Sequence, residues 1–265
     1  MGWSIGMSEE LVKSELLDRV LLVTLNRPSR LNAWTDSLED QYFDILTEAD
    51  SNPDVRAVVV TGAGRGFCAG AHMENLKSIS SGNSKTEARN RDRDLPLTIQ
   101  KPMIGAINGV AAGLGVVEAL YFDVRFGGPS TRFTTAFVRR GLIAEYGIAW
   151  LLPRTVGVSR ATDLLLSGRM IGAEEALRIG LLDFLVEDTD VVSAAIDYAN
   201  QLSEFCSPHS MATIKGQIHR SALSSYEESV VDANDLMLQS FQLSDFPEGV
   251  ASYLEKRSPE FPDFP

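Results

Sequence analysis

Residues 101–115 have the sequence KPMIGAINGVAAGLG. The short aliphatic run over residues 103–107 predicts a buried strand. The glycines that follow it predict a tight turn, and the apolar residues beyond them predict a helix that continues through Ala119. A strand that passes through a glycine-rich turn into a helix is the building unit of α/β folds, so this stretch predicts that class.

The same unit recurs on both sides of this stretch. Strands are predicted over residues 20–25, 55–61 and 122–126, and a helix over residues 36–50 with Thr35 or Asp36 as its N-cap. The polar stretch 78–94 predicts a loop or an exposed helix. After about residue 158 the strand signal fades, and helices are predicted over residues 159–166, 173–179, 190–205, 209–221, 226–241 and 247–257. We therefore expect an α/β body with a helical C-terminal extension.

The composition is that of an ordinary globular protein, with 44% hydrophobic and 23% charged residues, which excludes wholesale disorder. The net charge of −12 argues against binding to nucleic acid or to a membrane surface. Residues 172–205 hold 8 acidic and 1 basic side chain, and residues 223–265 hold 9 and 2, so the rest of the chain has a net charge of +2. The acidity is therefore local to the C-terminal helices and is compatible with an anionic ligand bound elsewhere.

Cysteine usage and hydropathy predict a cytoplasmic protein. Cys68 and Cys206 are too few for a disulfide framework. Residues 1–10 lack the basic and apolar regions of a signal peptide, and no run of apolar residues is long enough to span a membrane.

Several common catalytic motifs are absent from the sequence. No phosphate-binding GxxxxGK[ST] occurs, and the glycines at 62–66 fail the dinucleotide pattern because Phe67 stands at its last position. Gly157-Val158-Ser159-Arg160-Ala161 lacks the second glycine of GxSxG. The histidines show no HExxH spacing, so we expect neither a metal nor a resident cofactor.

Two glycine-bearing segments offer backbone amides to a ligand. They are residues 66–73 (GFCAGAHM) and residues 101–115. Small residues after a strand allow the backbone to approach a ligand closely, and a helix N-terminus favours a developing negative charge. Each segment taken alone is equally compatible with a tight turn.

Further motifs connect these segments to a known family. They are LNRP and LNA within 25–33, CAGA at 68–71, KP and NG within 101–109, SG, AEEA and GL within 167–181, and EGV and EKRSPEF within 248–261. In this order and spacing, from about residue 20 to 262, they resemble the enoyl-CoA hydratase/isomerase (crotonase) family. The resemblance implies a spiral of ββα units over residues 1–200 and a helical trimerisation region over 201–265. It also implies a homotrimer or a dimer of trimers.

The resemblance further implies an acyl-CoA thioester as ligand, with coenzyme A as part of the substrate. The amides of Ala71 and Leu114 would form an oxyanion hole that stabilises an enolate, an effect worth about 10²–10³ in rate for each donor. The substrate-binding residues expected from the resemblance are Arg27, Arg30, Ala69, His72, Met73, Gly113, Phe137, Tyr146 and Lys256. Arg27, Arg30 and Lys256 would approach CoA or simply be solvated. His72 would contact the adenine end of CoA or lie in solvent.

The acid–base residues depart from the hydratase pattern. The positions of the two glutamates typical of hydratases are occupied by Val117 and Phe137, and neither can transfer a proton. Glu118 is the next residue along a helix and is rotated by about 100°, so it is expected to face elsewhere.

Glu145, within GLIAEYG at 141–147, resembles the acid–base group of the Δ3,Δ2-enoyl-CoA isomerases and ring-opening isomerases of this family. Nearby Phe137, Ile143, Ile148 and Trp150 would supply an apolar pocket that raises its pKa. Tyr146 would shape the acyl pocket or hydrogen-bond the carboxylate. Alternatively, Glu145 caps helix 147–156 or pairs with Arg139 or Arg140.

The sequence thus predicts double-bond isomerisation. A hydratase, a hydrolase and a non-catalytic acyl-CoA-binding protein are the alternatives.

Overall fold

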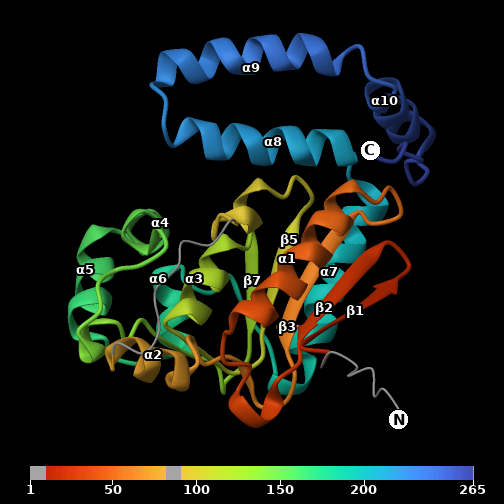
Figure 1. Cartoon of the computed structure of the whole chain (residues 1–265). Helices are drawn as coiled ribbons and strands as arrows, with labels where there is room; N and C mark the ends of the chain where they lie inside the picture. Colours follow the sequence, from red (N-terminus) through yellow and green to blue (C-terminus); the bar gives the residue numbers. More distant parts are fainter. Residues whose placement is uncertain (1–9, 82–90, 265) are drawn as a thin grey trace, which may run out of the picture.

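The computed structural model describes residues 10–81 and 91–264 and contains two sheets surrounded by helices (Figure 1). The strands are β1 Val12–Leu17, β2 Val20–Leu25, β3 Ala57–Gly62, β4 Gly66–Cys68, β5 Met103–Ile107, β6 Val110–Ala112, β7 Val124–Gly127, β8 Arg132–Thr134, β9 Ile171–Gly172 and β10 Phe184–Leu185. The α-helices are α1 Asp36–Ser51, α2 Met73–Ser80, α3 Leu114–Tyr121, α4 Ile148–Val156, α5 Val158–Ser167, α6 Ala173–Ile179, α7 Val191–Phe205, α8 Pro208–Ser221, α9 Tyr226–Ser240 and α10 Asp245–Glu255.

The larger sheet has the strand order β1-β2-β3-β5-β7-β10 and is parallel except for the antiparallel pair β1 and β2. All six residues of β3 are buried, as expected for a parallel strand that is covered on both faces. Val58 and Val60 pack in the same cluster as Leu38 of α1, while Val59 packs in a second cluster with Ala195 of α7. The core therefore lies on both sides of this sheet.

The smaller sheet has the order β4-β6-β8-β9, in which β4, β6 and β8 are parallel. Each of these three strands follows directly on a strand of the larger sheet, namely β3, β5 and β7. The chain therefore repeats a two-strand unit, followed by α2 after β4 and by α3 after β6. Because β4 and β6 are parallel neighbours, the segments that follow them lie at the same edge of the smaller sheet.

Most of the long elements agree with the sequence prediction, but the six-residue strand β1 was not predicted. Helix α1 begins where expected, and the Thr35 side chain accepts a hydrogen bond from the Leu38 N–H at 3.2 Å. The predicted helices of the C-terminal third are present as α5 to α10. Within the polar stretch 78–94, α2 ends at Ser80, and residues 82–90 lie outside the described residues. Residues 1–9, to which the signal-peptide prediction applies, also lie outside them.

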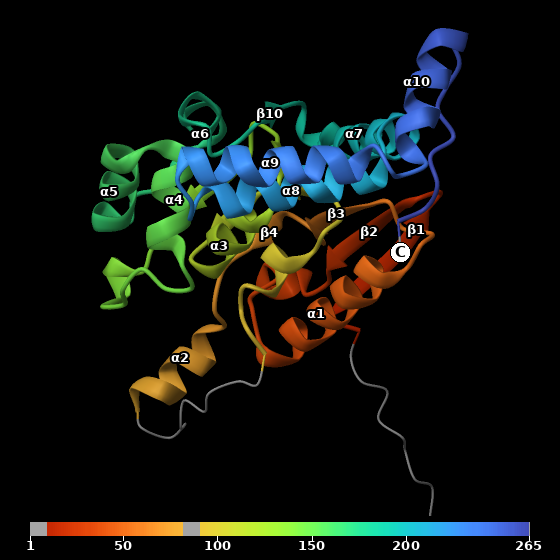
Figure 2. The same cartoon turned by 90° about the horizontal axis from the view of Figure 1, so that it is seen from above.

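The last three helices form a separate layer. Helix α7 packs on the larger sheet, and residue 200, the predicted boundary, lies inside it. Helices α8 and α9 then run antiparallel across one end of the body, and α10 projects beyond them (Figure 1 and Figure 2). Lys215 of α8 forms an ion pair with Asp123 at 2.8 Å, which ties this layer to the body. Within residues 10–81 and 91–264, no helix combines the length and apolarity that crossing a bilayer requires.

Candidate functional site

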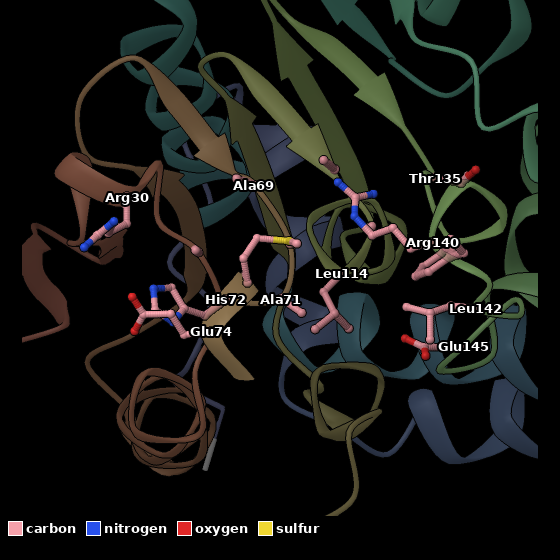
Figure 3. Close-up of a pocket in the computed structure, with 16 residues that line it drawn as sticks. Arg30, Ala69, Ala71, His72, Glu74, Leu114, Thr135, Arg140, Leu142 and Glu145 are labelled. Atoms are coloured by element: carbon pink, nitrogen blue, oxygen red, sulfur yellow. The ribbon is translucent and has the colours of Figure 1, made fainter. Parts of the chain in front are cut away.

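A cavity of about 380 Å³ opens where the segments after β4 and β6 meet (Figure 3). Backbone and side chains from four parts of the chain surround it. The lining residues are Arg30, Ala33, Ala69, Gly70, Ala71, His72, Met73, Glu74, Ala112, Gly113, Leu114, Thr135, Phe137, Arg140, Leu142 and Glu145. Both glycine-bearing segments singled out in the sequence therefore contribute to one cavity.

The N–H of Ala71 is available to a ligand in this cavity. Trp34 and Ala71 form a parallel β-bridge in which the Trp34 N–H donates to the Gly70 carbonyl at 2.8 Å and the His72 N–H donates to the Trp34 carbonyl at 3.0 Å. In such a bridge the N–H of the central residue points away from its partner strand. Within the described residues the Ala71 N–H has no acceptor.

The N–H of Leu114 is the second such amide. Leu114 is the first residue of α3, and the first N–H groups of a helix have no partner inside the helix. Gly113 precedes it with φ 53° and ψ −114°, a conformation that favours glycine, and it offers no capping side chain. The exposed amides and the helix dipole together favour a negative charge at this point.

Glycine brings the two amides into the same cavity. Gly70 has φ 84°, and a Cβ at this position would lie 2.5 Å from the Ala112 carbonyl oxygen and 3.5 Å from the Leu114 nitrogen. Only a residue without a side chain allows the segment after β4 to lie this close to the segment after β6. Two preorganised N–H groups in such an arrangement can bind an anionic oxygen that develops during a reaction.

The Asn32 side chain joins the loop that contains Arg27 to strand β4 next to the cavity. Its side chain is fully buried, and its Nδ2 donates to the carbonyls of Gly66 and Phe67 at 2.8 and 3.1 Å. Its Oδ1 accepts from the Arg27 N–H at 2.8 Å, and the Arg27 guanidinium donates to the Ala33 carbonyl. Arg27 therefore holds the loop next to the cavity and is absent from its lining, in contrast to Arg30.

Glu145 supplies a carboxylate to the cavity. It is half-buried, and within the described part of the chain its side chain makes no hydrogen bond or ion pair. Its backbone carbonyl, and not its carboxylate, accepts from the N–H of Ile148 at the start of α4. Arg139 donates instead to the Ser167 carbonyl and Arg140 to the Ala136 carbonyl, so neither is paired with Glu145. Burial raises the pKa of Glu145, and the positive charge of Arg93 opposes this shift.

The opposite side of the cavity is polar. Arg30, His72 and Glu74 lie together there, while Leu114, Leu142 and Glu145 lie across from them (Figure 3). The side that carries Glu145 also has Thr135 and Arg140, so charged groups line both sides of the cavity (Figure 3).

The remaining predicted residues fall into two groups. Ala69, Met73, Gly113 and Phe137 line the cavity, as Ala71, Leu114 and Glu145 do. Tyr146 faces a neighbouring cavity of about 380 Å³, and Lys256 ends α10, far from α2 at the opposite end of the molecule (Figure 1 and Figure 2).

The apolar surroundings of Glu145 differ from the expectation. Phe137 and Leu142 line the cavity with it. The prediction for the other three residues was wrong, because Ile143 is 78% exposed, Ile148 is buried in the core, and Trp150 faces the neighbouring cavity.

Glu118 lies outside the cavity lining, as its position on the helix predicted. It is 3% exposed, and its Oε2 has no hydrogen-bond partner among the described residues. Burial and the nearby Glu39 carboxylate raise the pKa of Glu118 well above its usual range.

Sequence reasoning missed several residues of the site. Glu74, Thr135, Arg140 and Leu142 line the cavity. Glu74 directly follows Met73, the last residue of the glycine-bearing segment 66–73, and is the second residue of α2. Its adjacency to that segment is the signal that could have identified it.

Comparison with known proteins agrees with this geometry. Residues 15–264 match the family model described as Enoyl-CoA hydratase/isomerase. The chain is 34% identical, with a TM-score of 0.88, to the crystal structure of a putative enoyl-CoA hydratase from Streptomyces coelicolor A3(2), covering 98% of both chains. For an enoyl-CoA hydratase from Polaromonas sp. JS666 the identity is 28% and the TM-score 0.89, covering 94% of this chain and 99% of that chain. The fold is therefore the crotonase fold.

Curated relatives have names from both reaction classes. The chain is 33% identical over 263 residues to 1,2-epoxyphenylacetyl-CoA isomerase of Escherichia coli (strain K12), covering 95% of this chain and 98% of that protein. It is 30% identical over 255 residues to the probable enoyl-CoA hydratase echA8 of Mycobacterium tuberculosis (strain CDC 1551 / Oshkosh), covering 96% and 99%. The overall similarity alone leaves the choice between isomerase and hydratase open.

Proposed function

Since this chain belongs to the enoyl-CoA hydratase/isomerase family, we propose that it moves the double bond of an enoyl-CoA thioester with Glu145 as its acid and base. The observation that carries the proposal is the position of Glu145. Its carboxylate has no partner among the described residues, and it shares the cavity with the amides of Ala71 and Leu114. A general base works best when its pKa is close to the working pH, and burial shifts Glu145 in that direction.

The proposed reaction needs only one proton-transfer group. The Glu145 carboxylate removes a proton from C2 of a 3-enoyl thioester, and the electron pair moves onto the thioester oxygen to give a dienolate. The amides of Ala71 and Leu114 donate to that oxygen and stabilise its charge. Protonated Glu145 then returns the proton to C4, and the double bond forms between C2 and C3. Nothing is added or lost, so no water has to be positioned.

Hydration of a 2-enoyl thioester is the second candidate, and Glu74 is the observation that favours it. A hydratase must place a water molecule and also deliver a proton, which normally requires two groups. Val117 and Phe137 cannot supply them, but Glu74 lines the same cavity as Glu145. Because Glu74 lies with Arg30 and His72 on the other side of the cavity, we favour isomerisation (Figure 3).

The polar side of the cavity is the proposed contact for CoA. Arg30 and His72 lie there (Figure 3), and Met73, which is 59% exposed, also lines the cavity. Arg30 supplies a positive charge suited to phosphate groups. Lys256 ends α10 on the opposite side of the molecule, so a contact between Lys256 and CoA requires the α10 of another copy.

A homotrimer or a dimer of trimers is proposed on the basis of the C-terminal helices. Large apolar side chains on α8, α9 and α10 are exposed, including Ile218 at 63%, Val231 at 61%, Leu238 at 59% and Leu254 at 72%. Patches of this kind mark protein interfaces in stable proteins. We propose that residues 201–265 form the oligomerisation region and that residues 1–200 form the catalytic body.

The test compares the wild type with Glu145→Gln and with a matched control, Glu74→Gln. Both substitutions remove one carboxylate from the same cavity, but from opposite sides. Each protein is given a 3-enoyl-CoA and a 2-enoyl-CoA, and the conjugated thioester absorbance, the hydrated product and free thiol are measured. We expect the isomerisation rate to fall by a factor of about 10²–10⁴ in Glu145→Gln and to stay near the wild-type rate in Glu74→Gln.

Other outcomes identify the alternatives. Full isomerase activity in Glu145→Gln overturns the proposal. Hydration that is lost in both variants identifies a hydratase, and release of free thiol identifies a hydrolase. Tight binding of both thioesters without turnover identifies an acyl-CoA-binding protein.

A further inference from the structure

A continuous set of contacts joins Ala71 to Tyr146, the residue next to Glu145. It begins at Trp34, whose backbone forms the bridge to Ala71. The Trp34 indole Nε1–H donates to Glu39 Oε2 at 2.8 Å, and the same carboxylate forms an ion pair with Arg93 at 2.5 Å. Glu39 is fully buried in α1, and the Arg93 side chain is 21% exposed, so this pair is shielded from solvent.

Arg93 then contacts the segment that carries Glu145. Its guanidinium carbon lies 4.7 Å from the centre of the Tyr146 ring, a cation–π contact with the residue next to Glu145. Tyr146 has φ 52°, in the left-handed region that is unusual for a residue with a side chain. Tyr121 donates its hydroxyl hydrogen to the Tyr146 carbonyl at 3.1 Å. Two side chains from elsewhere in the chain therefore hold this strained residue in place.

We propose that Arg93 is a positioning residue for Glu145, locked to the Ala71 segment through Glu39 and Trp34. The proposal rests on the proposed role of Glu145. We call Trp34, Glu39, Arg93 and Tyr146 the Arg93 bridge. It joins the segment that binds the thioester oxygen to the segment that moves the proton, although these are separated by more than 70 residues in the sequence. A group that acts through another in this way changes turnover more than binding.

Arg93 is also the positive charge behind Glu145. The other charged or titratable groups that line the cavity are Arg30, His72 and Glu74, across from Glu145, and Arg140, on the same side as Glu145 (Figure 3). Away from the lining, Arg93 acts on Glu145, Asp36 and Glu39 act on the neighbouring Tyr146, and Glu118 interacts with Glu39 and Arg93. Burial raises the pKa of Glu145, and Arg93 is the charge that lowers it. Removing the positive charge of Arg93 therefore raises the pH at which Glu145 loses its proton.

The experiment measures the pH dependence of kcat and KM for Arg93→Gln, Arg93→Lys and a control, Arg91→Gln. Arg91 lies two residues away and pairs with Asp44 on the surface, and the Glu39 charge is the smallest of the influences on it. In Arg93→Gln we expect the acidic limb of the kcat profile to move to higher pH and kcat to fall about 10-fold, with KM nearly unchanged. Arg93→Lys keeps the positive charge but lacks the planar group that stacks on Tyr146. The acidic limb should therefore stay at the wild-type pH, while kcat falls. Arg91→Gln should match the wild type in kcat and in the pH position of the acidic limb.

A second variant separates positioning from stability. Tyr146→Leu leaves the Arg93–Glu39 pair intact and removes only the stacked ring, so kcat should fall without movement of the acidic limb. The proposal is overturned if Arg93→Gln and Tyr146→Leu both keep the wild-type kcat and the wild-type position of the acidic limb of the kcat profile, whatever their melting temperatures. If Glu145→Gln is inactive while those two variants are unaffected, the proposed function stands and only the positioning role fails.

Discussion

Gly115 of α3 packs directly against the backbone of Cys68 in β4, so that a Cβ on Gly115 would lie 2.3 Å from the Cys68 carbonyl oxygen. Real side chains do not reach such distances, so Gly115→Ala must push the start of α3 away from β4. We expect a stability loss of about 1–3 kcal/mol and a loss in turnover of about 10-fold or more, because the Leu114 amide moves with the helix. Thermal unfolding and steady-state kinetics measure the two effects.

The matched control is another helical glycine. A Cβ on Gly249 in α10 would find its nearest neighbours, in the Phe261 ring, at 3.7 Å, an ordinary contact. Gly249→Ala should therefore keep full activity and gain up to about 1 kcal/mol from helix propensity. Equal behaviour of the two variants would show that the contact between α3 and β4 does not place the amide.

Glu118 should make the stability of the protein depend on pH. Its pKa is raised on folding, so above its usual value of 4.5 the unfolded chain loses a proton that the folded chain keeps. The folded state then binds more protons, and stability falls as pH rises from about 4.5 until the raised folded pKa is reached, by up to about 1.4 kcal/mol per pH unit. Glu118→Gln removes this term, so its melting temperature should exceed that of the wild type by a margin that grows with pH. A constant difference from pH 5 to 8 contradicts this assignment.

Asp123 should be worth more to stability than a typical surface carboxylate. Its Oδ2 accepts from the Met103 N–H at 2.7 Å and pairs with Lys215, whose side chain is only 10% exposed. Asp123→Ala leaves the Met103 N–H without its acceptor and leaves Lys215 with the Lys101 carbonyl alone, and should cost about 1–3 kcal/mol in denaturant unfolding. Asp232→Ala breaks the exposed pair with Arg220 and should cost at most about 1 kcal/mol. Equal costs would mean that Asp123 does not join α8 to the sheet.

The exposed face of α9 should be an interface between copies of the chain. Val231 and Leu238 are seven residues apart and therefore lie on the same face of the helix. The double substitution Val231→Asp and Leu238→Asp should reduce the molar mass in light scattering from that of a trimer or hexamer to that of a smaller species. Val158→Asp, at a position that is 73% exposed on α5, serves as the control. An unchanged mass in the double variant would place the interface elsewhere.

The elements predicted from the sequence are long ones, whereas the mostly exposed and polar strand β1 was missed although it has six residues. Helix α1 and the helices α5 to α10 have several turns, or glycine at their ends, and strands β2, β3 and β5 are continuous aliphatic runs. The strands β4, β6, β8, β9 and β10 have two or three residues each, too few to show an alternating pattern. The smaller sheet, which carries both free amides, therefore could not be recognised from periodicity.

The candidate site was predictable where it depends on backbone and not where it depends on tertiary contacts. Gly70 and Gly113 mark the two amide segments because glycine is needed there for φ and for close approach. Arg93 gave no comparable signal, since its partners Glu39 and Tyr146 are distant in sequence. Lys101 begins the stretch 101–115, yet it is buried and donates to carbonyls at the end of α1, a helix-capping role that its motif does not reveal.

The use of main-chain donors has a consequence for how this site tolerates change. The amides of Ala71 and Leu114 are present whatever side chain those positions carry, so many replacements there should preserve the donors. A single-residue insertion or deletion between residues 108 and 114 would instead turn a different amide toward the cavity and shift every residue of α3 by about 100°. The two donor positions, Ala71 and Leu114, are thus tolerant of substitution and intolerant of length change, so a scan of single-residue deletions would locate them more sharply than an alanine scan.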